Sequence, residues 1–248
     1  MIRLMIALQF LTVLPVHLKQ MPSPRQNAES LLFYPLIGLM MGAILLILAG
    51  WLLALPSLIL AVLVLTVWIW LTGGLHLDGL ADTADAWVGG FGDTDRTLQI
   101  MKDPACGPIG VLSLVVILLV KLSALYLLFE LQQFLFLLVV PVLGRLVPLF
   151  LFLSTPYVRK TGLGSAITTY LPKGWGWFVL LSGSMTALYF GWAGSLSLLT
   201  SLLVLLYLRW QFIRRIGGIT GDTVGAAIEI TETLAIMAFA LATFYRGQ

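Results

Sequence analysis

The strongest constraint on the fold is a series of long apolar runs, which occupy much of the 248-residue chain. The hydrocarbon core of a bilayer is about 30 Å thick, and a helix needs about 20 mostly apolar residues to cross it. Only 10% of the residues are charged, far fewer than the roughly 25% of a water-soluble domain. The sequence therefore predicts an all-α, polytopic transmembrane helical bundle of about seven spans. The candidate spans are residues 31–55, 58–75, 107–129, 134–153, 174–190, 195–207 and 224–244.

A shorter apolar stretch precedes the first candidate span. Residues 1–16 are apolar, carry Arg3 near their start and show no small-residue cleavage pattern before Pro15. A removed signal peptide would need such a pattern, so we expect a short interfacial or re-entrant helix here instead. No internal repeat and no low-complexity linker divides the chain, and we expect a single integral membrane domain over residues 1–248.

Basic residues fall on alternate connections between the spans. Lys and Arg in short loops stay on the cytoplasmic side of the membrane. The opposite connections, at residues 56–57, 130–133 and 191–194, contain no Lys or Arg, and only Arg246 falls on their side. This pattern predicts a cytoplasmic N-terminus, and the net charge of +3 gives no indication of nucleic-acid binding. The cytoplasmic set is Arg3, Lys19, Arg25, Arg96, Lys102, Arg159, Lys160, Lys173, Arg209, Arg214 and Arg215.

The acidic residues are clustered. The chain has 11 Asp and Glu, and most of them fall in two short stretches near span ends on the predicted cytoplasmic side. Like charges at this density repel one another unless a cation neutralises them. The sequence therefore places the candidate functional site at these two stretches. The first contains Asp78, Asp82, Asp85, Asp93, Asp95 and Asp103, and the second contains Asp222, Glu229 and Glu232.

The first stretch includes the string HLDGLADTADA at residues 76–86. Asp78, Asp82 and Asp85 have the spacing i, i+4, i+7, which puts three carboxylates on one face of a helix. Mg²⁺ prefers carboxylate oxygens and keeps positions open for water and substrate phosphate, so we expect these aspartates to be metal ligands. The alternative is a solvated acidic helix start favoured by the helix dipole. His76 is a candidate to orient a carboxylate or a substrate, with ordinary packing as its alternative.

The second stretch is GGITGDTVGAAIEITE at residues 217–232. Asp222, Glu229 and Glu232 recur on one helix face and would form a second acidic wall facing the first. We expect Asp222 to complete the metal site, with a helix cap at Asp222 and two interfacial acids as the alternative. Three glycines suit a tight turn whose backbone N–H groups hold phosphate, and they are Gly217, Gly218 and Gly221.

Two positive charges, Lys121 and Arg145, fall inside candidate spans. They either extend toward an interface or pair with the acids of the second stretch, and substrate phosphate is a further candidate partner. The turn MKDPACGPIG at residues 101–110 contains Lys102 and Asp103, which are candidate substrate-binding residues. A purely structural turn shaped by proline and glycine is the alternative.

Three strings form a signature when they are taken together. They are TGGLHLDGLADTADA at residues 72–86, MKDPACGPIG at residues 101–110 and GGITGDTVGAAIE at residues 217–229. These strings closely resemble the cobalamin synthase, or adenosylcobinamide-GDP ribazoletransferase, family. Residues 10–16, 33–43 and 162–164 extend the likeness over nearly the whole chain in the same order. The resemblance implies a bacterial cytoplasmic-membrane enzyme that joins adenosylcobinamide-GDP to α-ribazole, or its 5′-phosphate, with release of GMP and with Mg²⁺ as cofactor.

The resemblance and the residue chemistry together define an expected site on one catalytic domain. We expect Mg²⁺ to bridge carboxylates to the substrate pyrophosphate while a ribazole 3′-hydroxyl attacks the cobinamide-side phosphorus. The bulky corrin is expected in an interfacial groove lined by span ends and Trp or Tyr. The expected metal ligands are Asp78, Asp82, Asp85 and Asp222; the expected catalytic residues are Asp82, Asp222 and Glu229; and the expected substrate-binding residues are Lys102, Asp103, Gly217, Gly218, Gly221 and His76.

Two other functions share parts of this pattern. CDP-alcohol phosphotransferases also carry acidic stripes on membrane helices and use Mg²⁺, but their motif has an arginine where this chain continues with Ala81 and Asp82. A cation transporter would also carry buried acids, but transporters commonly show internal repeats, which this sequence lacks. For the expected enzyme, the partners are small-molecule substrates and the lipid bilayer, without nucleic acid. A homo-oligomer is an alternative to a single copy.

Overall fold

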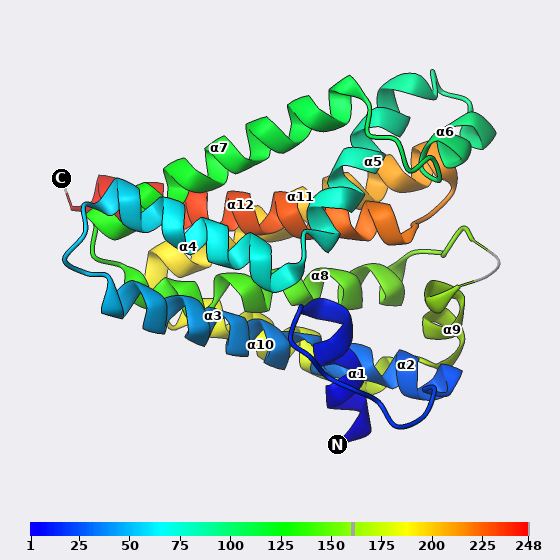
Figure 1. Cartoon of the computed structure of the whole chain (residues 1–248), viewed down its shortest axis with the longest axis horizontal. Coiled ribbons are helices and arrows are strands. Elements are labelled where there is room, and N and C mark those ends of the chain that lie inside the picture. Colours follow the sequence, from blue (N-terminus) through cyan, green and yellow to red (C-terminus); the bar gives the residue numbers. More distant parts are fainter. Residues whose placement is uncertain (160–161, 248) are drawn as a thin grey trace.

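The computed structural model describes residues 1–159 and 162–247, and every regular element in those two ranges is a helix (Figure 1). The all-α prediction is therefore confirmed. Lys160, one of the expected loop cations, lies outside the described residues. The elements in chain order are α1 (Ile2–Leu11), α2 (Pro24–Ser30), η1 (Leu31–Phe33), α3 (Tyr34–Trp51), α4 (Ser57–Thr72), α5 (Leu75–Gly89), α6 (Thr94–Ile100), α7 (Pro108–Glu130), η2 (Phe134–Leu138), α8 (Val140–Ser154), α9 (Leu163–Tyr170), α10 (Lys173–Leu188), α11 (Gly191–Ile216) and α12 (Gly221–Arg246).

Long apolar helices make the chain a multi-pass membrane protein. Within the described ranges, 5 helical stretches are long and apolar enough to cross a bilayer, and α4 with α5 forms a sixth, bent candidate. Each expected span coincides with a helix, although α4 and α10 have only 16 residues each. At 1.5 Å per residue each of these two helices is about 24 Å long, shorter than the apolar core of about 30 Å. The five stretches are Pro24–Trp51, Pro108–Glu130, Phe134–Ser154, Gly191–Ile216 and Gly221–Arg246.

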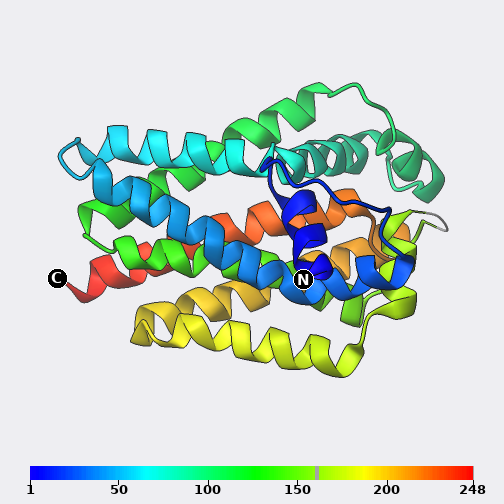
Figure 2. The ribbon, with the colours of Figure 1, turned by 60° about the horizontal axis from the view of Figure 1, so that its bottom comes forward.

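The long helices run along the longest axis of the molecule (Figure 1 and Figure 2). The C-terminus and the α3–α4 turn lie at one end of the bundle, and α6 and α9 lie at the other. The 10-residue α1 runs across the long helices in both views. The backbone N–H of Val13 ties the segment after α1 to the end of α4, because it donates to the Leu71 carbonyl at 2.9 Å. The short N-terminal helix expected from the sequence is therefore present.

An abrupt change of direction separates α4 from α5, whose axes meet at 86°. Gly73 and Gly74 make this bend with φ angles of 61° and 71°, a left-handed conformation that residues with a Cβ disfavour. The expected span over residues 58–75 therefore ends at Thr72, and α5 continues as a separate helix. Because α5 carries several aspartates and leaves the direction of α4, we treat it as lying outside the membrane-spanning segments.

The helix α11 is longer than the apolar pattern predicted. It has 26 residues, Gly191–Ile216, whereas the expected span covers residues 195–207. The additional turns contain Arg209, Arg214 and Arg215, whose charges end the apolar run without ending the helix. Arg214 and Arg215 lie in the last turn, where the helix dipole favours cations. Basic residues that were expected in a loop are therefore part of a helix.

Candidate active site

The helices α5 and α12 cross at glycines. Gly79 of α5 lies so close to α12 that a Cβ there would be 2.7 Å from the backbone oxygen of Asp222. A Cβ at Gly225 of α12 would likewise be 3.3 Å from the backbone of α5. Small residues allow two helix backbones in a membrane bundle to approach closely. The crossing therefore brings Asp78, which directly precedes Gly79, and Asp82, three residues after it, into the neighbourhood of Asp222, as expected from the sequence.

Asp82 shows the electrostatic effect of this crossing. Burial, the largest cause, raises the pKa of the Asp82 carboxyl, and three neighbouring carboxylates bring it to about 6. These neighbours are Asp78, Asp222 and Asp85, and the positive charge of Arg159 opposes them by lowering the pKa. An isolated aspartate has a pKa of about 3.9. Negative charge therefore exceeds positive charge around Asp82, and this condition favours the binding of a cation.

Arg159 provides positive charge at the edge of this acidic group. Its guanidinium donates a hydrogen bond to the Asp222 carboxylate at 2.6 Å, and both side chains are partly exposed. A short backbone pairing holds this arginine in place. The N–H of Ile219 donates to the Pro156 carbonyl at 2.8 Å, and the N–H of Val158 donates to the Ile219 carbonyl at 2.9 Å. The segment after α8 is thereby fixed beside the start of α12.

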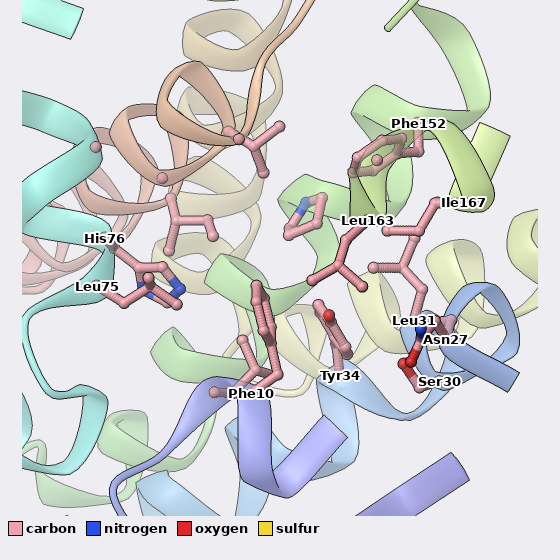
Figure 3. A pocket seen from close by; sticks show the side chains of 18 of the residues that line it. Phe10, Asn27, Ser30, Leu31, Tyr34, Leu75, His76, Phe152, Leu163 and Ile167 are labelled. Carbon is pink, nitrogen blue, oxygen red and sulfur yellow. The ribbon is translucent and has the colours of Figure 1, made fainter. Parts of the chain in front are cut away.

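A cavity of about 440 Å³ opens beside the crossing. It is lined by residues of α1, α2, α3, α5, α8, α9 and α12, and Asp78 and Asp222 are among them. In the view of Figure 3, His76 lies across the cavity from Ile167, with Phe10 and Tyr34 between them. Most of the lining side chains are aliphatic or aromatic. The cavity is therefore an apolar chamber that has carboxylates of both acidic stretches in its wall.

The turn before α12 contains three glycines. Two of them shape or pack the backbone, and the third borders the cavity. Gly217 ends α11 in a left-handed conformation with φ 76°, and its N–H donates to the Ile213 carbonyl. Gly218 packs against the segment after α8, where a Cβ would be 2.2 Å from the Pro156 oxygen. Gly221 lines the cavity. Of the three glycines expected to bind phosphate, Gly221 is therefore the one that borders the cavity.

Thr220, rather than Asp222, caps α12. The Thr220 hydroxyl accepts a hydrogen bond from the Thr223 N–H at 3.2 Å, and the Thr223 hydroxyl accepts one from the Thr220 N–H at 2.9 Å. This reciprocal arrangement satisfies the start of the helix without Asp222. The alternative in which Asp222 serves as the helix cap is therefore wrong, and its carboxylate is directed to Arg159.

Asp85 differs from the other two aspartates of α5. Its carboxylate accepts hydrogen bonds from the N–H groups of Gly107, at 2.7 Å, and Gly110, at 2.8 Å. Gly107 is the N-cap residue of α7, so Asp85 caps that helix from a neighbouring element. A Cβ on either glycine would meet the Asp85 carboxylate. The structure therefore gives Asp85 an architectural role that Asp78 and Asp82 do not share.

The acidic group is not a complete metal cage. Among residues 1–159 and 162–247, no three Asp, Glu, His or Cys side chains converge closely enough to hold an ion by themselves. Mg²⁺ usually binds through one or two carboxylates and takes its remaining ligands from water and substrate phosphates. Asp78, Asp82 and Asp222 offer oxygen ligands of that kind, together with an excess of negative charge. The donor chemistry therefore fits an Mg²⁺ ion that binds together with a phosphate-bearing substrate.

A second group of charges is fully buried between the long helices. Lys121 of α7 donates to Glu229 at 3.0 Å and to Glu232 at 2.8 Å, both on α12. Arg145 of α8 also pairs with Glu232. The Lys121 ammonium lies 4.2 Å from the centre of the Trp68 ring on α4. The expectation that Lys121 and Arg145 pair with the acids of the second stretch is confirmed, and their burial excludes extension to an interface.

Seven expected site residues are not part of the cavity lining: Asp82, Asp85, Lys102, Asp103, Gly217, Gly218 and Glu229. Three of them, Glu229, Lys102 and Asp103, are also not among the charges that shift the pKa of Asp82. Glu229 belongs to the buried network, where Lys121 balances its charge. Lys102 and Asp103 are exposed in the turn between α6 and α7, and Asp103 accepts a hydrogen bond from the Ala105 N–H at 3.0 Å. None of the three lines the cavity. The geometry thus favours the structural alternatives, an ion pair for Glu229 and a turn for Lys102 and Asp103.

No sequence motif indicates a site role for Arg159 or for the aromatic wall of the cavity. The pattern of basic residues assigns Arg159 only to the cytoplasmic face, which is also the predicted face of the acids. Phe10 and Tyr34, whose rings stack with centroids 6.1 Å apart, belong to no chemical motif. The available signal was their position in residues 10–16 and 33–43, two strings that contribute to the family resemblance.

The chain is similar to curated proteins over almost its whole length. A protein of Acinetobacter baumannii named adenosylcobinamide-GDP ribazoletransferase is 59% identical over 240 residues, which are 97% of this chain and 97% of that protein. Two proteins with the same name, from Pseudomonas fluorescens and Pseudomonas syringae, are 50% and 51% identical, covering 97% and 95% of this chain and 100% and 98% of their own lengths. No solved structure matches. The model of the cobalamin-5-phosphate synthase family matches residues 3–240, and the chain belongs to that family.

Proposed function

We propose that this chain joins adenosylcobinamide-GDP to α-ribazole, or to α-ribazole 5′-phosphate, and releases GMP. The family and the names of the relatives support the cobalamin assembly step, and they argue against a CDP-alcohol phosphotransferase or a cation transporter. The observation that carries the finer proposal is the meeting of acids from α5 and α12 beside an open cavity. Acids in such a group repel a diphosphate ester unless a cation lies between them.

We include Mg²⁺ in the proposal as the cofactor. One or two carboxylates of the group Asp78, Asp82 and Asp222 would hold it, together with phosphate oxygens of the substrate. When bound there, Mg²⁺ would neutralise negative charge on the diphosphate and on the leaving phosphate. With a pKa of about 6, the Asp82 carboxyl is ionised at neutral pH and can serve as a ligand. Asp85 supports this arrangement indirectly, because it holds the turn before α7 against α5.

The chain's own residues position the substrates and accept a proton. Phosphoryl transfer depends mainly on positioning and on stabilisation of charge. In the proposed reaction the ribazole 3′-hydroxyl oxygen forms a bond to the cobinamide-side phosphorus, and the bond from that phosphorus to the GMP oxygen breaks. The hydroxyl proton passes to a carboxylate oxygen of Asp82 or Asp222. Arg159 and the N–H groups in the first turn of α12 bind phosphate oxygens.

The test is turnover by the purified full chain in nanodiscs. With adenosylcobinamide-GDP, α-ribazole and Mg²⁺, we expect adenosylcobalamin and GMP in equal amounts, and no product in excess chelator. Asp82→Asn should lower kcat on the order of 10²- to 10³-fold, because a charge that holds the cation is lost. Full activity in chelator, or normal turnover of this variant, contradicts the proposal.

Asp95→Asn is the matched control for this experiment. Asp95 is an exposed acid in the first turn of α6, outside the cavity lining. Asp95→Asn removes the same negative charge by the same substitution as Asp82→Asn. It therefore reports any general effect of losing a carboxylate. We expect near-normal kcat and an unchanged Mg²⁺ dependence for this variant.

We also propose that the site faces the cytoplasm across a bacterial inner membrane. The connections that carry Arg96, Lys102 and Arg159 lie at the end of the bundle that also holds α6, opposite the C-terminus (Figure 1). Lys and Arg in short connections favour the cytoplasmic side. The acids of α5 and the start of α12 lie in the same half of the molecule, and both proposed substrates are then available from the cytoplasm.

A further inference from the structure

We propose that the cavity binds the base of the acceptor nucleoside, and that the corrin of the other substrate stays outside it. This assignment rests on the proposed function, since it gives one substrate of that reaction a particular place. It is carried by the size of the cavity, by the aromatic character of its wall and by a buried imidazole that faces it. It also modifies the expectation for the corrin, which is left to the outer surface around the cavity.

The volume separates the two substrates. Small-molecule pockets commonly measure about 300–1,000 Å³. At about 440 Å³, this cavity is at the lower end of that range and can hold a nucleoside with a two-ring base. A corrin ring with its side chains and its adenosyl group has several times as many atoms as such a nucleoside. The cavity is therefore too small for the corrin and suited to the acceptor.

Two pairs of stacked aromatic rings line the cavity. Phe10 and Tyr34 have ring centroids 6.1 Å apart and an interplanar angle of 22°. Phe152 and Tyr157 have centroids 5.8 Å apart and an angle of 30°. Phe10 is 44% exposed although it belongs to the cavity wall, so its ring has free area for contact. Flat bases bind to aromatic side chains by stacking, and both pairs are surfaces of this kind.

The wall favours an apolar base over guanine, the base of the leaving nucleotide. Guanine carries several hydrogen-bond donors and acceptors on its edges, and each needs a partner when it is buried. The neutral amides and hydroxyls of the lining belong to five side chains, against fourteen aliphatic or aromatic ones with the two tyrosines counted in both groups, and the Ser30 hydroxyl already donates to the Asn27 carbonyl at 2.7 Å. Leu31, Leu163 and Ile167 form an aliphatic part of the wall (Figure 3). The benzimidazole base of α-ribazole has methyl groups on its edge and no N–H, which matches this surface.

His76 gives the cavity a polar contact for the sugar. It is 3% exposed, lines the cavity, and its Nδ1 has no hydrogen-bond partner within the described residues. A buried nitrogen without a partner is costly, and a ribose hydroxyl would satisfy it. Asp78 and Asp222 line the same cavity. A nucleoside seated against the aromatic wall therefore has its ribose close to both His76 and the proposed cation site.

The experiment compares the two substrates in variants of the cavity wall. Phe10→Ala removes a stacking surface, and Leu163→Trp fills part of the space. Both variants should raise the KM for α-ribazole by about tenfold or more. The Kd for α-ribazole, measured without adenosylcobinamide-GDP, should rise by a similar factor. The KM for adenosylcobinamide-GDP and the affinity for GMP should change little. Phe178→Ala, which removes an exposed ring of α10 outside the cavity, is the matched control and should leave all these constants near wild type.

Several outcomes would overturn the assignment. The first is unchanged ribazole binding in both variants. The second is a selective loss of affinity for adenosylcobinamide-GDP or GMP. The third is that native mass spectrometry finds a phospholipid bound to the wild type and not to Leu163→Trp, while this variant keeps the wild-type affinity for α-ribazole. If Phe10→Ala fails to fold, Phe10→Leu keeps the apolar bulk, and the same loss of ribazole binding is expected from the missing ring.

The binding measurement also separates this inference from the proposed function. If the wild type binds α-ribazole in a manner that depends on Phe10 but forms no adenosylcobalamin, the proposed reaction fails and the cavity assignment stands. If the wild type forms product and the wall variants keep a normal KM for α-ribazole, the reaction stands and the cavity assignment fails.

Discussion

Asp82 and Glu232 both lie on helices that pack against one another, yet their surroundings are opposite. Glu232 is fully buried between the cations of Lys121 and Arg145, so the protein itself balances its charge. Asp82 has other carboxylates as neighbours, and its raised pKa reflects a local shortage of positive charge. Perturbed groups of the second kind cluster at functional sites, because a ligand rather than the fold completes them. This contrast distinguishes the proposed binding site from the structural network at the level of single residues.

The structural network leads to a prediction about stability. Lys121→Met should destabilise the bundle by about 3–5 kcal/mol, because it removes one partner of a buried ion pair and leaves excess negative charge. Thermal unfolding in detergent, followed by circular dichroism, measures the effect. Lys173→Met, which removes an exposed lysine at the start of α10, is the control and should unfold near the wild-type temperature.

A second variant tests whether charge balance is the reason. Lys121→Met combined with Glu229→Gln removes one cation and one anion, so it should recover part of the lost stability. If the double variant is less stable than Lys121→Met alone, the account of the network as a balance of charges is wrong.

At the scale of elements, the crossing of α5 and α12 determines the distance between the two acidic stretches. Gly79→Ala would place a Cβ 2.7 Å from the backbone oxygen of Asp222, so α5 must shift away. A displacement of about 1 Å can reduce turnover by about 10²-fold, and we expect kcat to fall by at least about tenfold. Gly50→Ala in α3, where a Cβ meets nothing within 4 Å, is the matched control and should keep its activity. Equal kcat values for the two variants would show that the crossing does not set the site.

The cap that Asp85 provides for α7 leads to another prediction at this scale. Asp85→Asn keeps one carbonyl oxygen but loses the second acceptor, and loss of a capping interaction costs about 1 kcal/mol. We expect a lower unfolding temperature with an unchanged Mg²⁺ concentration for half-maximal activity. Asp82→Asn should show the reverse, a near-normal unfolding temperature with a changed Mg²⁺ dependence. A large shift in the Mg²⁺ dependence of Asp85→Asn would instead make Asp85 a metal ligand.

Local patterns in the sequence predicted much of this architecture, but they identified only some of the long-range contacts, such as the pairing of Lys121 with the acids of α12. Apolar runs located the helices, and the 3.6-residue repeat placed Asp78 and Asp82 on one face of α5. The pairing of Asp85 with Gly107 joins residues 22 positions apart, and that of Arg159 with Asp222 joins residues 63 apart, so no local signal reports either. Helical spacing also explains why the sequence places Glu229 at the site. The spacing shows that Glu229 shares a face of α12 with Asp222, but it does not show which residue of another helix contacts that face.

At the scale of the whole molecule, the orientation in the membrane can be tested with the single cysteine. Cys106 is exposed in the turn before α7, at the end of the bundle proposed to face the cytoplasm. A membrane-impermeant maleimide should label it in inside-out vesicles and leave it unlabelled in intact spheroplasts. Glu130→Cys in a Cys106→Ser background reports the opposite end of α7 and should show the reverse pattern. Labelling of Cys106 from outside intact cells would place the acidic site on the other face.

The buried network also bears on how the bundle is completed during synthesis. The helices α7 and α8 precede α12 in the chain, so Lys121 and Arg145 leave the ribosome before the two glutamates that balance them. Until α12 enters the membrane, both cations lack these partners in an apolar environment, where an unpaired charge is costly. Arrival of α12 therefore joins three helices at once through their side chains. A nascent chain that stops before α12 should remain loosely associated and be degraded rather than accumulate as a stable half-bundle.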